Sequence, residues 1–426
     1  MNANMKDSGI EWIGLVPKTW VLKKNKYNFE LEKEIVGDSS SHTQLLSLTK
    51  NGIKAINEDE QSGKTPLSFD TYQVVHKNDI VMCLFDLDVS AVFSGISPYE
   101  GMISPAYKCF RCLPHLYPKY VDYYFRTVFD GRKYKRYSKN VRFSLGTEEF
   151  MAIPILVPPL DEQKQIADTL DCLIPEVDNI NANTRESIEG YRKLRQIIIT
   201  EAVTGHVGRE ESFKKVEDLF GEEVPLEWDV CKLKYLSDEI GDGLHSTPEY
   251  DDEGSIFFVN GNNIGGEYLT MKDNTNRINE EELAKYKTPK LNMNTIMISL
   301  NGATYGKTSF YNMEDVLLGK SAGYITLKEN VNKRYIRYYL QSTIAQELMT
   351  YSLNGTTIQN LSLGTLNEFP IIIPDEHSQK IIVEYLDEKC KEIDQLIKKK
   401  EIFLEEMENY KKSLIYEYVT GKKNVE

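Results

Sequence analysis

The sequence contains an internal repeat whose two copies are displaced by a constant distance. Residues 154–205 recur as residues 370–421, so the displacement is 216 at both ends of the segment. Each copy opens with two prolines that bracket an apolar triplet, continues through a Gln-Lys pair and a Leu-Asp pair, and closes on Val-Thr-Gly. No gap is needed anywhere between these landmarks. The repeat therefore predicts two similar halves before any other feature is considered.

Each copy of the repeat is predicted to form one long helix. Apolar and small residues recur in alternating steps of four and three, which is the pattern of a coiled-coil seam. Forty-odd residues at about 1.5 Å each predict a rod of roughly 60–65 Å. The alternative is two amphipathic helices that pack on separate cores, and Pro175 is expected to kink or delay the first helix. The predicted seams are Ile166, Leu170, Leu173, Val177, Ile180, Thr184, Ser187, Tyr191, Leu194 and Ile198, and then Ile382, Leu386, Lys389, Ile393, Leu396, Lys400, Phe403, Met407, Tyr410 and Leu414.

A second motif marks the start of each half. Val-Pro-x-x-Trp occurs at residues 16–20 and again at residues 224–228, and each copy is followed by strand-like runs and glycine-bearing loops. We therefore predict a mixed α/β (α+β) protein with two domains and two long helices. The predicted boundaries are a first domain over 1–157, a helix over 158–205, a linker and second domain over 206–373, and a second helix over 374–426.

Composition favours a soluble protein and gives no direct support to nucleic-acid binding. The apolar runs are short and broken by prolines, and the first residues do not form a signal peptide. Six cysteines without framework spacing predict a cytoplasmic location. The formal charge is −14, but residues 1–150 carry a net charge of +2 whereas residues 151–230 carry −9. A local basic face is therefore compatible with the acidic total.

The motifs that could support catalysis or metal binding are incomplete. Residues 302–308 (GATYGKT) are one residue short of a phosphate-binding loop, and the residues after them favour a strand or turn over the required helix. Cys109, Cys112 and His115 lack the second ligand pair of a zinc site, and alternation along residues 107–111 favours a half-buried strand. The six histidines show no triad spacing. We predict a non-catalytic chain without a metal site.

Basic and amide-rich segments are the best candidates for a nucleic-acid surface. Residues 132–143 place six cations among three aromatic rings, and residues 333–339 form a shorter run of the same kind. Cations neutralise phosphates, whereas Asn and Gln side chains pair with base edges. The alternatives are a solvated helix face for the basic run and ordinary turn chemistry for the amide-rich loops. The candidates are Lys133, Lys135, Arg136, Lys139, Arg142, Asn260, Asn262, Asn263, Asn301, Thr304, Lys307, Thr356, Thr357 and Gln359.

These motifs together resemble a known family, the DNA-specificity subunits of Type I restriction-modification systems. The resemblance covers essentially the full length and is carried by residues 12–20, 158–167 (PPLDEQKQIA), 199–205 (ITEAVTG) and 241–248 (GDGLHSTP). The last segment adds His245 and Ser246 to the candidate DNA-binding residues. In the second repeat, residues 375–378 (DEHS) depart from the PLDE of the first repeat, and Pro175 is also unexpected.

The resemblance implies both an architecture and a set of partners. Two target-recognition domains would each read one half of a bipartite duplex DNA target, and the two helices would pair as an antiparallel coiled coil with pseudo-twofold symmetry. The helices would set the gap between the half-sites and bind two modification subunits that use S-adenosylmethionine. Restriction subunits that use ATP and Mg would complete the assembly, and no cofactor would bind this chain.

Two other functions remain open from the residues alone. The acidic total charge favours a coiled-coil adaptor without DNA recognition. The Gly-Lys-Thr triplet at residues 306–308 would instead favour a nucleotide-using enzyme.

Overall fold

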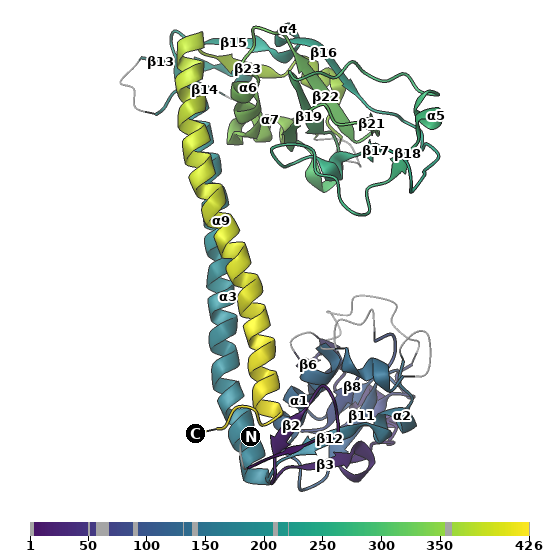
Figure 1. The fold of residues 1–426 in the computed structure, drawn as a ribbon. Helices are drawn as coiled ribbons and strands as arrows, with labels where there is room; N and C mark the ends of the chain where they lie inside the picture. Colours follow the sequence, from purple (N-terminus) through teal and green to yellow (C-terminus); the bar gives the residue numbers. More distant parts are fainter. Residues whose placement is uncertain are drawn as a thin grey trace. The chain divides into compact units, whose positions relative to one another are not determined.

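The computed structural model describes residues 4–49, 52–56, 68–87, 93–130, 132–138, 144–207, 212–219, 221–353 and 360–425. The chain divides into two compact units (Figure 1). The first unit comprises residues 1–184 and 402–426, and the second comprises residues 185–401. Each long helix therefore contributes one part to each unit.

The first unit is built from short antiparallel strands, on which helices such as α1 and α2 pack. Its main sheet has the strand order β4-β11-β8-β9, and β3 pairs with β12 beside it. The elements are β1 (Met5–Asp7), β2 (Leu15–Pro17), β3 (Val21–Lys24), β4 (Phe29–Leu31), β5 (Leu46–Thr49), β6 (Gly52–Ala55), β7 (Gln73–Val75), β8 (Ile80–Met82), β9 (Ser94–Ile96), β10 (Gly101–Ile103), β11 (Lys108–Cys112), α1 (Pro118–Asp130), the 3₁₀ helix η4 (Lys133–Arg136), α2 (Thr147–Ala152), β12 (Pro154–Val157) and parts of α3 and α9.

The second unit repeats this plan with different loops. Its main sheet has the order β16-β22-β19-β20, β15 pairs with β23, and a three-stranded sheet β18-β17-β21 is added. The elements are β13 (Phe213–Val216), β14 (Glu222–Pro225), β15 (Asp229–Lys232), α4 (Leu233–Leu236), β16 (Ser237–Asp242), β17 (Ile256–Val259), η6 (Gly261–Asn263), β18 (Arg277–Ile278), α5 (Glu280–Leu283), β19 (Thr295–Ser299), η7 (Gly302–Thr304), β20 (Thr308–Phe310), β21 (Val316–Leu318), β22 (Ala322–Leu327), α6 (Lys333–Gln341), α7 (Thr343–Ser352), α8 (Leu363–Asn367) and β23 (Pro370–Ile373).

The two long helices confirm the predicted helical repeat. Helix α3 (Leu160–Val203) and helix α9 (Glu376–Val419) are each 44 residues long, and Pro175 does not end α3. In the first unit, the Lys411 ammonium lies 2.5 Å from the Asp178 carboxylate. In the second unit, Arg195 Nε lies 3.0 Å from Asp394 Oδ1. As the residue number rises along α3 its partner's number falls along α9, so the helices pair antiparallel.

Five of the twenty predicted seam residues are exposed, so the predicted seam is wrong at these positions. Ile180, Leu194, Leu396, Phe403 and Tyr410 are between 39% and 50% exposed. The buried positions of α3 lie one residue further on, in steps close to the 3.6 residues of a straight helix turn. Each helix also packs against its domain, which widens the buried face beyond a two-helix seam. The buried residues of α3 include Ile166, Leu170, Ile174, Val177, Asn181, Thr184, Ile188 and Ile199, and those of α9 include Leu386, Cys390, Ile393, Leu414 and Tyr418.

The Gln-Lys pair of the repeat explains how each helix begins. The amide nitrogen of Gln163 donates to the Pro158 carbonyl oxygen at 2.8 Å, and that of Gln379 donates to the Pro374 carbonyl oxygen at 2.9 Å. Each glutamine thus bonds the segment between the preceding strand and the first helical turn, where the chain changes direction. The constant spacing between proline and glutamine follows from this bond.

The Val-Thr-Gly triplet explains how each helix ends. Gly205 after α3 and Gly421 after α9 both have positive φ, at +83° and +67°. A Cβ atom on Gly205 would lie 2.4 Å from the Pro225 ring, and one on Gly421 would lie 2.4 Å from the Pro17 ring. The Val-Pro-x-x-Trp motif therefore packs directly against the glycine that terminates a long helix.

No helix in the described part of the chain is both long enough and apolar enough to cross a membrane. All six cysteines are free thiols.

We expect Gly205→Ala and Gly421→Ala each to lower the free energy of unfolding by about 2–4 kcal/mol. The left-handed backbone and the contact with the proline ring both oppose a methyl group there. Urea unfolding of the full chain, followed by circular dichroism, measures the effect. Gly190→Ala is the matched control: Gly190 lies inside α3 with nothing within 4 Å of an added Cβ. That control should raise stability by about 0.5–1 kcal/mol, and equal effects at all three sites would contradict this interpretation.

Candidate nucleic-acid interface

A connected group of loops in the second unit brings most of its predicted DNA-binding residues together. The first of these loops follows β17. The backbone N–H of Asn260 donates to Asn263 Oδ1 at 3.0 Å, which closes the short helix η6. Ser321 Oγ donates to Asn260 Oδ1 at 3.0 Å and accepts from the Gly261 N–H at 2.9 Å. The hydroxyl of Ser321 thus fixes the position of the asparagine loop.

The other two loops contact the first directly. A Cβ atom on Gly261 would lie 2.4 Å from Ser299 Oγ and 3.1 Å from Thr304 Oγ1, so the loop that contains η7 packs on η6. After β16, Leu244 forms a backbone bridge with Gly319, next to Ser321. The loops that carry His245, Asn260 and Thr304 therefore form one surface at the ends of β16, β17 and β19. We call this surface the loop cluster.

The predicted residues of the loop cluster differ in what their side chains are free to bind. Asn263 is 6% exposed, and its amide donates to the Thr270 carbonyl and to the Thr275 hydroxyl, so it stabilises the loop. Thr304 shares a hydrogen bond with Ser299 at 2.8 Å. By contrast, Asn262 is exposed, and its side chain forms no hydrogen bond with the described residues.

The remaining predicted residues of the second unit lie at the edges of the loop cluster or outside the described residues. His245 is exposed and its Nε2 lies 2.8 Å from Asp242 Oδ2, and Ser246 beside it is also exposed. Asn301 forms a backbone bridge with Asn360. Lys307 is exposed at the start of β20. Thr356, Thr357 and Gln359 lie outside the described residues.

The Gly-Lys-Thr triplet does not form a phosphate-binding loop. Residues 300–307 connect β19 to β20, which pair antiparallel with Ile298 opposite Thr308. Strand β20 begins at Thr308, where a phosphate-binding loop would lead into a helix. The structure therefore confirms the interpretation of this segment as a strand connection.

In the first unit, the basic run is partly engaged with protein groups. The Lys133 ammonium lies 4.2 Å from the centre of the Trp12 ring and 4.8 Å from that of Tyr416 on α9. Burial, and then the charge of Lys422, lower the Lys133 pKa. Arg136 pairs with Glu11 at 2.9 Å. Lys133 thus contributes to the packing of the domain on α9, and its role in DNA binding stays a prediction.

The other members of the basic run are less informative. Lys135 is half-buried, and Lys139 and Arg142 lie outside the described residues.

Cys109 and Cys112 both lie on strand β11, as the sequence predicts, and burial raises the pKa of both thiols to about 12. Across the described residues, no group of three or more His, Cys, Asp or Glu side chains is arranged to hold a metal.

The second unit also contains a groove of about 1150 Å³ between its domain and its parts of α3 and α9. Its walls include seven cationic side chains but only three carboxylates. We call it the basic groove. Sequence reasoning missed it because its residues come from five separate segments. The cations are Arg192, Arg195, Lys307, Arg334, Arg337, Lys391 and Lys398, and the carboxylates are Glu267, Asp387 and Asp394.

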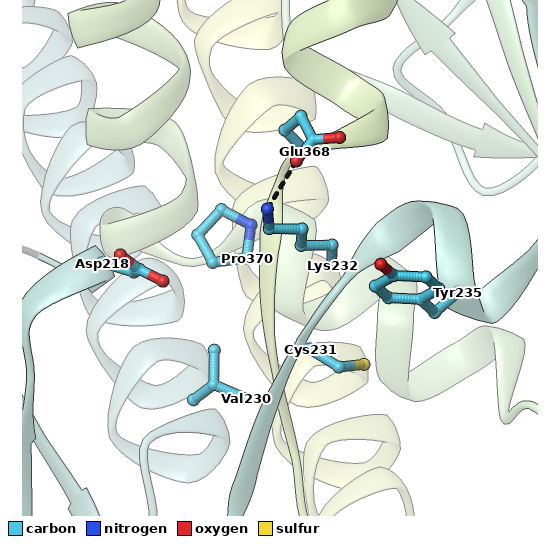
Figure 2. A pocket seen from close by; sticks show the side chains of 7 residues that line it. All are labelled: Asp218, Val230, Cys231, Lys232, Tyr235, Glu368 and Pro370. Carbon is cyan, nitrogen blue, oxygen red and sulfur yellow. Dashed lines mark hydrogen bonds and ion pairs between the residues drawn. The ribbon is translucent and has the colours of Figure 1, made fainter.

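A smaller hollow of about 510 Å³ lies beside β15 and β23 (Figure 2). Figure 2 shows the Glu368 carboxylate directed at the Lys232 ammonium, and the two lie 2.6 Å apart. Lys234 also binds Glu368, and these two hydrogen bonds lower the pKa of Glu368 to about 2. Both lysines that meet this carboxylate are therefore already neutralised, which makes this hollow a weaker anion site than the basic groove.

The fold and its repeat match a described family. The sequence profile of the Type I restriction modification DNA specificity domain matches the chain twice, over residues 22–190 and 225–406. These two matches cover most of the chain, which therefore belongs to this family. The two copies also coincide with the two halves that the 216-residue displacement predicted.

Individual relatives and a solved structure agree with this assignment. The MjaVIII specificity subunit of a Type I restriction enzyme from Methanocaldococcus jannaschii is 28% identical over 279 residues, which is 64% of this chain and 63% of that protein. The EcoBI specificity subunit from Escherichia coli is 23% identical over 285 residues, or 62% of this chain and 57% of the relative. The matched regions thus span less than two thirds of these two relatives.

A chain from a structure of a type I R-M system, described in terms of complex assembly and conformational transition, superposes with a TM-score of 0.70. It has 16% sequence identity, and the match covers 96% of this chain and 99% of that one. This similarity confirms the predicted mixed α/β fold with two long helices.

We expect Asn262→Ala to weaken binding of the chain's target duplex by about 10- to 100-fold. An exposed amide that pairs with a base edge contributes about 1–3 kcal/mol of discrimination. Competition between target and non-target duplexes, measured by fluorescence anisotropy, separates lost recognition from general weakening. Asn263→Ala is the contrasting variant, because losing its buried bonds should lower the unfolding free energy by about 1–3 kcal/mol. Full target discrimination in Asn262→Ala would remove this residue from the predicted set.

Proposed function

We propose that this chain is the DNA-specificity subunit of a Type I restriction-modification enzyme. Each unit reads one half of a bipartite duplex target. The observation that carries the proposal is the family match in two copies, over residues 22–190 and 225–406. The relatives described above, which are specificity subunits of Type I restriction enzymes, support the same role.

The comparison of the two units supports a bipartite target. Their main sheets have equivalent strand orders, β4-β11-β8-β9 and β16-β22-β19-β20, whereas the loops differ. Two similar domains on one chain present two readers to a duplex, and unlike loops give unlike half-sites. The exposed asparagine of the loop cluster supplies a donor and an acceptor of the kind that reads base edges.

The long helices support two further parts of the proposal, the spacing and the docking of modification subunits. Helices α3 and α9 each contribute residues to both units, so we propose that their length sets the gap between the two half-sites. Both helices also carry large apolar side chains exposed to solvent, including Ile180, Ile197, Ile402 and Phe403. Exposed apolar side chains that gather on one element favour binding of another protein.

The catalytic steps are assigned to the partners of this chain. Modification subunits would use S-adenosylmethionine, and restriction subunits would use ATP and Mg. This division is supported by residues 302–308, which resemble a nucleotide-binding loop in sequence but lead from strand β19 into strand β20.

Co-expression with the modification subunits, followed by single-molecule sequencing of the host DNA, tests the proposal. We expect methylated adenines within a bipartite motif that has a fixed unspecified gap. A soluble assembly that methylates no motif would instead favour an adaptor without DNA recognition.

The spacing role has its own test, a matched insertion of one heptad into each helix. Insertion after Thr184 in α3 and after Leu404 in α9 lies between the two repeated ion pairs, so both pairs are retained. Seven residues add about 10 Å and nearly two whole helical turns. We expect both half-sites to be unchanged and the gap between them to lengthen by up to about three base pairs. An unchanged gap in the mapped methylation motif would exclude the spacing role. Gly190→Ala, which alters α3 without changing its length, should leave the motif unaltered.

A further inference from the structure

The basic groove contains more positive charge than its own carboxylates neutralise. All three of its carboxylates are already paired. Asp394 pairs with Arg195 at 3.0 Å, and Arg334 pairs with Asp387 at 3.1 Å and with Glu267 at 3.9 Å. Arg192 pairs with Glu401 at 2.9 Å. Four other cations lining the groove have no carboxylate within 4 Å among the described residues. These four are Lys307, Arg337, Lys391 and Lys398.

Arg337 is the most unusual of the four because it is largely desolvated. One of its terminal nitrogens donates to the Gly266 carbonyl at 2.8 Å and to the Thr308 carbonyl at 3.2 Å, and the guanidinium lies 4.8 Å from the centre of the Phe310 ring. Its Nε is buried and has no hydrogen-bond partner among the described residues. Burial, and then the charge of Arg195, lower its pKa to about 10. The side chain remains cationic at neutral pH, and holding such a charge without a carboxylate opposes folding.

Comparison of the two units distinguishes two kinds of groove residue. Some form ion pairs that also occur at the equivalent positions of the first unit, and we call these shared pairs the frame; the others have no equivalent there. The frame pairs recur in the first unit: Lys411 with Asp178 matches Arg195 with Asp394, and Lys119 with Asp171 matches Arg334 with Asp387. These ion pairs therefore belong to the shared scaffold.

The four unpaired cations do not recur. When the units are matched through their buried tyrosines, sheet registers and the 216-residue displacement, the position of Arg337 is occupied by Asp122. The positions of Lys307, Lys391 and Lys398 are occupied by Phe93, Pro175 and Ala182. Because the first unit keeps the same frame without these cations, the frame does not require them. Residues that the fold does not require, and that are unfavourable for stability, are expected at functional sites.

We propose that the basic groove of the second unit binds backbone phosphates of the duplex, through Lys307, Arg337, Lys391 and Lys398. This inference rests on the proposed DNA-specificity function. It adds that the second unit contacts backbone phosphates through cations that the first unit lacks. Lys307 links the groove to the loop cluster, because its side chain lies beside Gly265, which follows η6. A strand whose bases meet the loop cluster can thus continue along the groove, where α9 contacts its phosphates. Contacts of this kind set the position of the protein on the duplex without reading sequence.

The double variant Lys391→Gln/Lys398→Gln tests the proposal in the full chain assembled with its modification subunits. Both lysines are exposed on α9, so the fold should be preserved. Affinity is measured by fluorescence anisotropy for a 30-base-pair duplex with the mapped motif and for one without it, over a series of salt concentrations. We expect weaker binding of both duplexes and a fall of about 1.8 in the slope of log K against log salt, about 0.9 for each lost phosphate contact. The methylated motif should be unchanged. Arg337→Gln should weaken binding of both duplexes by about tenfold.

The matched control is Lys399→Gln/Lys412→Gln, which removes the same charge from exposed positions of α9 that do not line the groove. This control should leave the salt slope within about 0.5 of the unmodified chain's. Equal slopes for the groove variant, the control and the unmodified chain, with the motif still methylated, would overturn the groove proposal alone. Loss of modification subunits from the groove variant, with normal salt dependence in the remaining assembly, would identify a protein-docking surface and overturn it as well. If the unmodified assembly binds no duplex and methylates no motif, the proposed function itself fails and the groove proposal fails with it.

Discussion

One buried tyrosine in each unit joins a strand of the domain to the end of a long helix. The Tyr120 hydroxyl lies 3.0 Å from the Leu156 carbonyl oxygen on β12 and 3.2 Å from the Val419 carbonyl oxygen at the end of α9. The Tyr335 hydroxyl occupies the same position between Ile372 on β23 and Val203 at the end of α3, at 3.0 and 3.5 Å. Burial raises the pKa of both phenols well above the usual value, so each remains a donor. Without such a donor, buried carbonyls at a helix end would lose a partner and destabilise the junction.

The two units share these tyrosine junctions, yet the residues on their surfaces differ. Asp122 and Arg337 occupy equivalent positions beside the buried tyrosines yet carry opposite charges. Asp122 pairs with Arg126 at 2.8 Å within the first unit, whereas Arg337 donates to the backbone carbonyls of Gly266 and Thr308 and lines the basic groove. The tyrosines and the ion pairs between the helices are shared by both units. Recognition chemistry is therefore free to change in one unit without an accompanying change in the other.

The sequence predicted the repeat and the two long helices because both depend on spacing, which is visible in the chain itself, whereas the antiparallel pairing was implied by the family resemblance. The alternating 4-3 pattern predicted the buried residues of the two helices only in part. It placed Ile180 and Phe403 inside, whereas the structure buries Asn181 and half-buries Leu404, each one residue further on. Packing against a domain widens the buried face of a helix, and the width of that face is not encoded in the spacing of one helix.

The loop cluster could be predicted by residue type but not by role. Asn262 and Asn263 are adjacent and chemically identical, yet one is exposed and the other is bonded to Thr270 and Thr275. Only the tertiary course of the chain distinguishes them. The basic groove could not be predicted from the sequence, because Lys307, Arg337 and Lys391 are separated by dozens of residues and come together only after folding.

The division of the chain into units also has a consequence for the order in which it folds during synthesis. The second unit is a continuous segment, residues 185–401, whereas the first requires residues 402–426 in addition to residues 1–184. The ribosome makes residues 402–426 after both of the other segments, and the Tyr120–Val419 contact spans 299 positions. The second unit can therefore fold while translation continues, whereas the first, although made earlier, must wait for α9 to emerge. Until then its docking surface for α9, which includes Trp20 and Tyr120, stays uncovered and available to chaperones.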